Sequence, residues 1–181
     1  MAGVNSADEL RNLKALCPPP PNLGPSHHER PERTGRNIPG NHDDLIAAYG
    51  TGCFDEFLWV FANGAENANL DIDTSTRVMQ SILHGKAVPA LREALSHYRT
   101  SPEELIQWGV TDNGDSFLWI PVGDAESWPT VVVQAGQLDF VISDKSSTGV
   151  ILGLLAGALR ISFFPEDFPS DQPEFLTDPY A

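Results

Sequence analysis

The chain has 181 residues, of which 41% are hydrophobic, and a formal net charge of −14. Residues 101–181 contribute −11 of that charge, because they contain 2 Lys or Arg and 13 Asp or Glu. The length and composition suit one domain with a buried core. The charge argues against binding to nucleic acid or to an anionic membrane, since both need a basic protein surface.

The first residues predict a short helix in a cytoplasmic protein. The opening MAGVNSADEL has no basic stretch followed by an apolar one, so no secretory signal is visible and we expect a cytoplasmic location. Residues 6–9 form a capping-box pattern that would make Ser6 the N-cap, and leucines follow at helical spacing. These features predict a helix over 7–16.

Residues 17–37 are rich in proline and predict an extended arm. We therefore assign residues 1–37 to an N-terminal helix plus this arm. Cys17 lies in the arm and Cys53 in a turn-like segment, and neither belongs to a Cys-x-x-Cys pair. We expect two reduced thiols, no structural zinc and no cofactor.

A more regular pattern begins at Ile38. Pro39 suits the first turn of a helix, and Gly50 is placed to end it. Residues 57–62 (FLWVFA) then predict a buried strand.

A long helical stretch follows, reaching about His97, with a break expected near Gly85 or Pro89. Three residues at its start are candidate N-caps, namely Asp73, Thr74 and Ser75.

The second half predicts four strands and a final helix. The strands are expected at 105–111, 116–122, 130–134 and 138–142, and the helix at 146–159. We predict one α+β domain over 38–168, with a mixed or antiparallel sheet and flanking helices. Residues 169–181 form an acidic tail that we expect to be loosely held.

The stretch WGVTDNGDSFLWI (108–120) has the composition of either a metal-binding loop or a hairpin. A calcium-binding EF-hand loop needs an acid at its third position and glutamate at its twelfth. Counted from Asp112, those positions hold Gly114 and Gly123, so the spacing fails. Asn113-Gly114 instead favours a type I′ turn closed by Asp112 and Asp115.

That turn fixes the expected pairing of the two strands. The pairs are Val110 with Phe117, Trp108 with Trp119, and Ile106 with Pro121. Most of these side chains would share one face of the sheet, which predicts an aromatic cluster there.

The stretch GNHDD (40–44) resembles a ligand motif of binuclear metallophosphoesterases, in which Asn and His bind the metals. That chemistry also needs an upstream Asp-x-His and further histidines downstream, and the chain has no such pattern. We therefore expect the first turn of a helix, with its acidic residues near the positive end of the helix dipole.

The order and spacing of these segments resemble the SUKH superfamily over roughly residues 38–168. The stretch 38–61 is similar to the opening of that family, 108–120 to its central hairpin, and 128–133 and 146–168 to its last segments. The residues that carry the resemblance are Pro39, Tyr49, Gly50, Gly52, Phe54, Phe57, Trp108, Gly109, Thr111, Gly114, Asp115, Trp119, Trp128, Pro129 and Val131.

The resemblance implies an α+β fold and a protein that binds another protein without catalysis. Most bacterial SUKH proteins are immunity proteins of polymorphic and contact-dependent toxin systems, which silence a cognate toxin that is often a nuclease. A fungal branch regulates cell-wall assembly and signalling through protein–protein interaction. We expect an immunity protein bound to a basic toxin domain; the alternative is an intracellular regulatory or scaffold protein of the same fold.

No catalytic or metal-binding residue carries over from the family. Expectations for partner contacts rest on charge and on predicted exposure, because acidic side chains steer a basic partner toward its binding surface. A solvated turn is the competing explanation for each of them. The six candidates are Asp71, Asp73, Asp112, Asp115, Asp124 and Glu126.

Overall fold

The computed structural model describes residues 5–21, 35–86, 89–137 and 139–178, and within them seven strands form one sheet. The strand order is β6-β5-β4-β3-β2-β1-β7, and every pairing between neighbours is antiparallel. The predicted α+β class is confirmed. The strands are β1 (Gly52–Phe54), β2 (Leu58–Val60), β3 (Ile106–Thr111), β4 (Ser116–Trp119), β5 (Thr130–Val133), β6 (Phe140–Ser143) and β7 (Phe175–Thr177).

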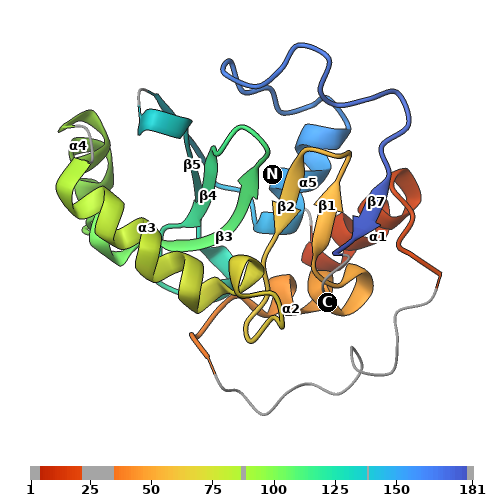
Figure 1. The fold of residues 1–181 in the computed structure, drawn as a ribbon, viewed down its shortest axis with the longest axis horizontal. Coiled ribbons are helices and arrows are strands. Elements are labelled where there is room, and N and C mark those ends of the chain that lie inside the picture. The colour runs from red at the N-terminus through yellow and green to blue at the C-terminus, as the bar shows by residue number, and fades with distance from the viewer. Residues whose placement is uncertain (1–4, 22–34, 87–88, 138, 179–181) are drawn as a thin grey trace.

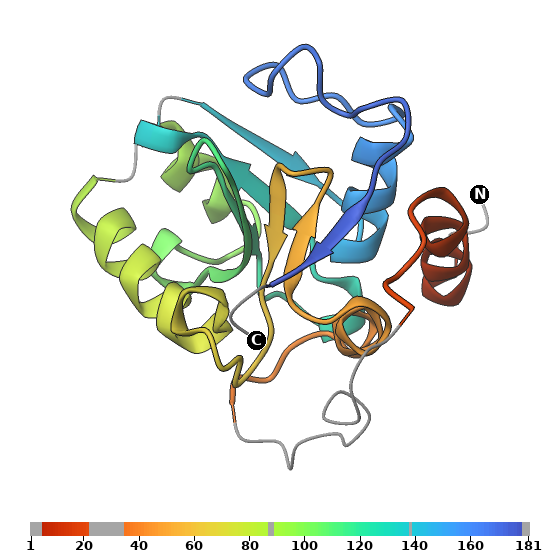
Figure 2. The same ribbon diagram turned by 45° about the vertical axis from the view of Figure 1, so that its right-hand side comes forward.

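Helices cover both faces of this sheet (Figures 1 and 2). On one face α1, α2 and α5 pack together, and on the other face lie α3 and α4. The helices are α1 (Ser6–Leu16), α2 (Gly40–Tyr49), α3 (Ile72–Lys86), α4 (Pro89–Ser96) and α5 (Ser147–Leu155).

The alternation of side chains along β4 explains the two layers. Phe117 and Trp119 point into the larger core, which they share with α1, α2 and α5. Leu118 points into the smaller core, with Leu83 of α3 and Leu91 of α4. Successive residues of a strand face opposite sides, so one apolar strand holds helices on both faces.

The ends of the first two helices follow the predicted signals with one correction. Gly50 ends α2 with φ 75, as expected for a left-handed glycine, and Pro39 immediately precedes that helix. The predicted N-cap of α1 is wrong, because Asn5, and not Ser6, accepts the backbone N–H of Ala7. The predicted arm 17–37 lies largely outside the described residues.

The start of α3 also differs from the prediction. The carboxylate of Asp71 accepts both the backbone N–H and the hydroxyl of Thr74, so Asp71 is the cap and the three predicted caps lie inside the helix. α3 ends at Lys86 and α4 begins at Pro89, and residues 87–88, where the predicted break would fall, lie outside the described residues. Ser146 caps α5, which ends at Leu155 instead of at residue 159.

The segment after residue 168 is not a loose tail. Its strand β7 pairs with β1, a strand that the sequence did not predict. Gly52 lies opposite Thr177, and a Cβ atom on Gly52 would lie 2.2 Å from the carbonyl oxygen of Leu176. Only glycine allows this close approach.

The turn of the β3–β4 hairpin is not of type I′. The N–H of Gly114 donates to the carbonyl of Thr111 (2.9 Å), and Thr111 in turn donates to the carbonyl of Asp115 (2.9 Å). Gly114 has φ 88, whereas Asn113 is not among the described residues with positive φ. The loop is therefore a type I turn followed by a left-handed glycine, the arrangement of a three-residue hairpin loop.

This loop shifts the predicted pairing. Val110 lies opposite Ser116 and Ile106 opposite Trp119, and a β-bulge separates Gln107 from Gly109. Because of the bulge, Trp108 lies on the same face of the sheet as Phe117, and the centroids of the two rings are 4.9 Å apart. The predicted pairs are wrong, but the aromatic cluster is confirmed.

Candidate functional site

The six carboxylates predicted to meet a partner lie at three separate places. Asp71 and Asp73 begin α3, Asp112 and Asp115 belong to the β3–β4 hairpin, and the other two lie in the loop between β4 and β5. Most of them already form hydrogen bonds or ion pairs within the chain, so they are not equally available to attract another protein.

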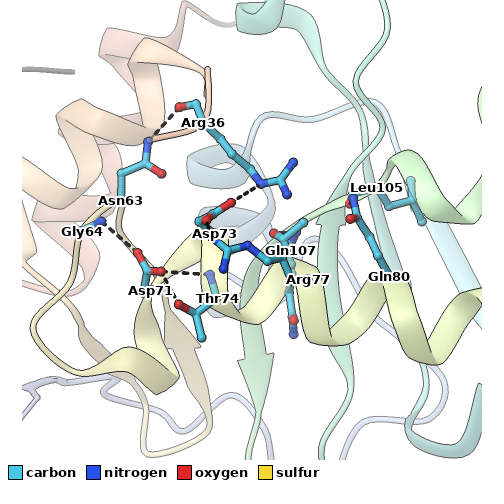
Figure 3. Close-up of polar contacts among 11 residues, drawn as sticks. Arg36, Asn63, Gly64, Asp71, Asp73, Thr74, Arg77, Gln80, Leu105 and Gln107 are labelled. Atoms are coloured by element: carbon cyan, nitrogen blue, oxygen red, sulfur yellow. Dashed lines mark hydrogen bonds and ion pairs between the residues drawn. The ribbon is translucent and has the colours of Figure 1, made fainter. Parts of the chain in front are cut away.

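Asp71 and Asp73 hold the start of α3 in place (Figure 3). Asp73 forms ion pairs with Arg36 (2.9 Å) and with Arg77. Burial raises the pKa of the Asp71 carboxyl, but hydrogen bonds from Thr74 and Gly64 outweigh it and leave the pKa below its usual value. Two arginines already neutralise Asp73, so this pair offers little attraction to a basic partner.

Asp115 does not lie at the surface, contrary to the expectation. Its side chain is only 2% exposed and accepts the hydroxyl of Thr111 (2.8 Å) and the N–H of Ala135 (2.9 Å). Asp112 is exposed and accepts the indole N–H of Trp59 (2.8 Å). Of the two hairpin aspartates, only Asp112 can meet a partner.

The loop between β4 and β5 contains Asp124 and Glu126, and both are exposed. Asp124 accepts the N–H of Glu126 within a short 3-10 turn. The Glu126 carboxylate accepts the N–H groups of Gly40 and Asn41 (3.1 Å for Asn41). It therefore caps the first turn of α2 from a distant part of the sequence, where a negative charge is favoured.

Replacing Glu126 with alanine is expected to lower the free energy of unfolding by about 1 kcal/mol, because two N–H groups of α2 lose their acceptor. Urea denaturation of the variant measures this. Asp124→Ala is the control, since it removes the same charge from the same loop and only a local contact. Equal stability of the two variants would contradict the capping role.

The family-pattern residues are largely structural. Trp108, Trp119 and Trp128 are buried in the larger core. A Cβ atom on Gly109 would lie 2.8 Å from the carbonyl oxygen of Trp59, so this glycine lets β2 approach β3. Pro129 precedes β5, and its carbonyl accepts the N–H of Ile120.

His42, from the GNHDD stretch, is fully buried and belongs to the core. Its Nε2 lies 2.8 Å from the carbonyl oxygen of Phe61 and its Nδ1 lies 2.9 Å from the hydroxyl of Ser147. A carbonyl can only accept, so Nε2 carries the proton and Nδ1 accepts from the serine. The ring also packs edge-on against Trp119, with 4.8 Å between the two ring centroids. His42 thus links α2, the end of β2 and α5.

Burial lowers the pKa of His42 to about 4, although its hydrogen bond to Phe61 acts in the opposite direction. The His42 ring is buried away from water, and neither of its two hydrogen-bond partners is a carboxylate that could stabilise a positive charge. The imidazole is therefore neutral at physiological pH.

A groove that the sequence did not predict lies between the tip of the β1–β2 hairpin and the loop that leads into β7. It has a volume of about 490 Å³. We call it the acidic groove, and it is lined by Asp55, Glu56, Phe57, Pro165, Asp167, Phe168, Ser170, Gln172, Glu174 and Leu176.

Four of these lining residues are carboxylates, and none is basic. Asp55 joins the two sides of the groove, because its side chain accepts the N–H (2.7 Å) and the hydroxyl of Ser170, in the loop that leads into β7. Glu56 and Asp167 are exposed. Asp55 and Glu56 both have positive φ, at 53° and 54°, in the hairpin turn. Neither is glycine, and the other side of the groove comes from residues 165–176, so the turn alone could not have revealed it.

No family model, no curated protein and no solved structure matches the chain. In the part of the chain that the structure describes, no helix is long and apolar enough to cross a membrane. Within the same ranges, no three His, Cys, Asp or Glu side chains gather as potential metal ligands.

Proposed function

We propose that this chain is a non-catalytic protein-binding module of SUKH type, an immunity protein that binds and neutralises a cognate toxin. The observation that carries the proposal is the acidic groove, whose lining combines four carboxylates with Phe57 and Phe168. The resemblance over residues 38–168 and the −11 charge of residues 101–181 add to it.

The chemistry of the groove suits a basic partner. A nuclease toxin has a basic surface for its substrate, and a protein rich in carboxylates can occupy that surface in place of phosphates. The charge would speed the encounter, while slow release would depend on buried contacts. Protection against a lethal enzyme calls for sub-nanomolar affinity, about −12 kcal/mol or better.

Reversing two charges of the acidic groove, with Glu56→Lys and Asp167→Lys together, is expected to weaken toxin binding about tenfold at low salt. Both side chains are exposed, so the fold should survive. Association and dissociation rates on immobilised toxin measure the effect, which should fall mainly on association. The control is Asp139→Lys with Asp144→Lys, which makes the same charge change beside the opposite edge strand, β6.

The proposal itself is tested by co-expressing this chain with a toxin-like protein, sought first among the proteins encoded next to it. Rescue of growth and co-purification of the two proteins are the expected results. Failure of both would overturn the immunity function. A different partner in pull-downs, with no toxin encoded nearby, would instead support the regulatory or scaffold alternative.

A further inference from the structure

One end of the sheet has a face that no helix of the described chain covers. Four neighbouring side chains, one each from β7, β1, β2 and β3, form a row across it. It is the same face of the sheet that α3 and α4 cover at the other end. In Figure 1 this face of β1, β2 and β7 is toward the viewer, without a helix in front of it. We call it the open face, and its residues are Leu176, Cys53, Trp59 and Val110.

The open face is apolar and partly accessible. Leu176 is 47% exposed, and Trp59 and Val110 are half-buried. Between Leu176 and Trp59 lies Cys53, which is only 2% exposed, so its larger neighbours cover it. The hydrogen bond from the indole of Trp59 to Asp112 fixes the ring in one orientation. A partly exposed tryptophan that is already held in one orientation is typical of a binding surface.

Carboxylates border this face. Asp112 accepts the indole N–H of Trp59, and Asp55 and Glu56 follow β1 directly, in the turn between β1 and β2. Burial and, after it, the negative charges of these three carboxylates raise the pKa of the Cys53 thiol to about 12. Leu176 also lines the acidic groove, together with Glu174. The open face and the acidic groove therefore form one continuous surface with an apolar centre and an acidic border.

We infer that a basic segment of the partner protein docks on the open face, with an apolar side chain against Leu176 and an arginine against the ring of Trp59. The inference rests on the proposed function and names the surface that would carry it. The acidic border complements arginine, whose planar guanidinium also stacks on aromatic rings. A second copy of this chain is a poor occupant, because the same carboxylates would meet across the contact and repel one another.

Binding of a defined peptide tests this inference without the toxin. The probe is Arg-Leu-Arg-Leu-Arg, and the readout is the indole N–H signal of each tryptophan in a proton–nitrogen NMR spectrum, with Trp59→Phe identifying the signal of Trp59. Since Trp108, Trp119 and Trp128 are buried, we expect the peptide to shift the Trp59 signal alone. The peptide Glu-Leu-Glu-Leu-Glu should leave all four unchanged.

Two matched substitutions locate the contact. Leu176→Ala is expected to weaken peptide binding about fivefold, because it removes the exposed apolar anchor. Val78→Ala is the control, since Val78 is also an exposed apolar residue but lies on α3. Glu56→Gln should weaken binding about threefold at low salt, whereas Asp144→Asn, near β6, should not.

The inference is overturned if the Trp59 signal stays in place at saturating peptide, or if Leu176→Ala binds as tightly as the unchanged protein. Neither result bears on the immunity function, which is decided separately by whether this chain rescues growth when a toxin is co-expressed. Conversely, failure of rescue together with a shifted Trp59 signal and weaker binding by Leu176→Ala would leave the open face as a binding surface for a different basic partner.

Discussion

Replacing His42 with alanine is expected to lower the free energy of unfolding by about 4 kcal/mol. The substitution leaves a cavity beside Trp108 and Trp119. It also removes the hydrogen-bond partners of the Phe61 carbonyl and of the Ser147 hydroxyl. An empty space and two buried polar groups without partners each cost stability, and here they occur at one position.

The same residue should make stability depend on pH. The pKa of His42 is about 4 in the folded chain and 6.5 as an ordinary histidine, so between these values the unfolded chain binds more protons. The free energy of unfolding therefore falls as the pH falls from 6.5 toward 4, by roughly 3 kcal/mol in all. Above pH 6.5 both states hold the neutral ring, and His42 adds no further pH dependence.

Urea denaturation at a series of pH values measures both effects. Glu103 loses its ion pair only at much lower pH, because the hydrogen bond from Arg92 holds its pKa at about 2. The interval from pH 6.5 to about 5 therefore reports mainly on His42. His42→Gln keeps a donor for Phe61 and should abolish the slope in this interval. His97→Ala, at an exposed histidine, should retain it; a slope that survives in His42→Gln would show that another group is responsible.

Replacing Asp115 with alanine is expected to cost about 3 kcal/mol of unfolding free energy, the second largest effect. The buried carboxylate accepts the hydroxyl of Thr111 and the N–H of Ala135, and so ties the β3–β4 turn to the turn between β5 and β6. Hydrogen bonds to a charged acceptor are stronger than neutral ones, and the buried hydroxyl of Thr111 would lose its acceptor.

Asp112→Ala is the matched control for this prediction. It removes the same charge from the same hairpin, but Asp112 is exposed, and its carboxylate accepts the indole N–H of Trp59 at the surface. We expect it to cost less than about 1 kcal/mol. Thermal unfolding of the two variants side by side distinguishes them, and Asp115→Asn should fall between them because its amide oxygen can still accept from Ala135. Similar losses in Asp112→Ala and Asp115→Ala would contradict the role given to the buried carboxylate.

The local sequence determined those features that depend on neighbouring residues. Gly50, with positive φ, ends α2, and Pro89 begins α4. The three consecutive apolar residues of β4 point alternately to the two faces of the sheet and pack against helices on both. Each follows from backbone preferences or from side-chain periodicity within a few residues. The aromatic cluster of Trp108 and Phe117 also followed from this periodicity, even though the expected pairing was wrong.

The candidate site depended on contacts between distant segments. Asp115 and Glu126 looked like exposed loop acids, but one is buried against Ala135 and the other caps α2. The acidic groove joins residues 55–57 to 165–176, and neither segment alone has a motif. The sequence by itself determined where helices, turns and most of the strands form, because local backbone energetics sets them. Only the tertiary structure decided the partner of each carboxylate and the position of the open face, because pairing of β1 with β7 gains its free energy from residues far apart in the chain.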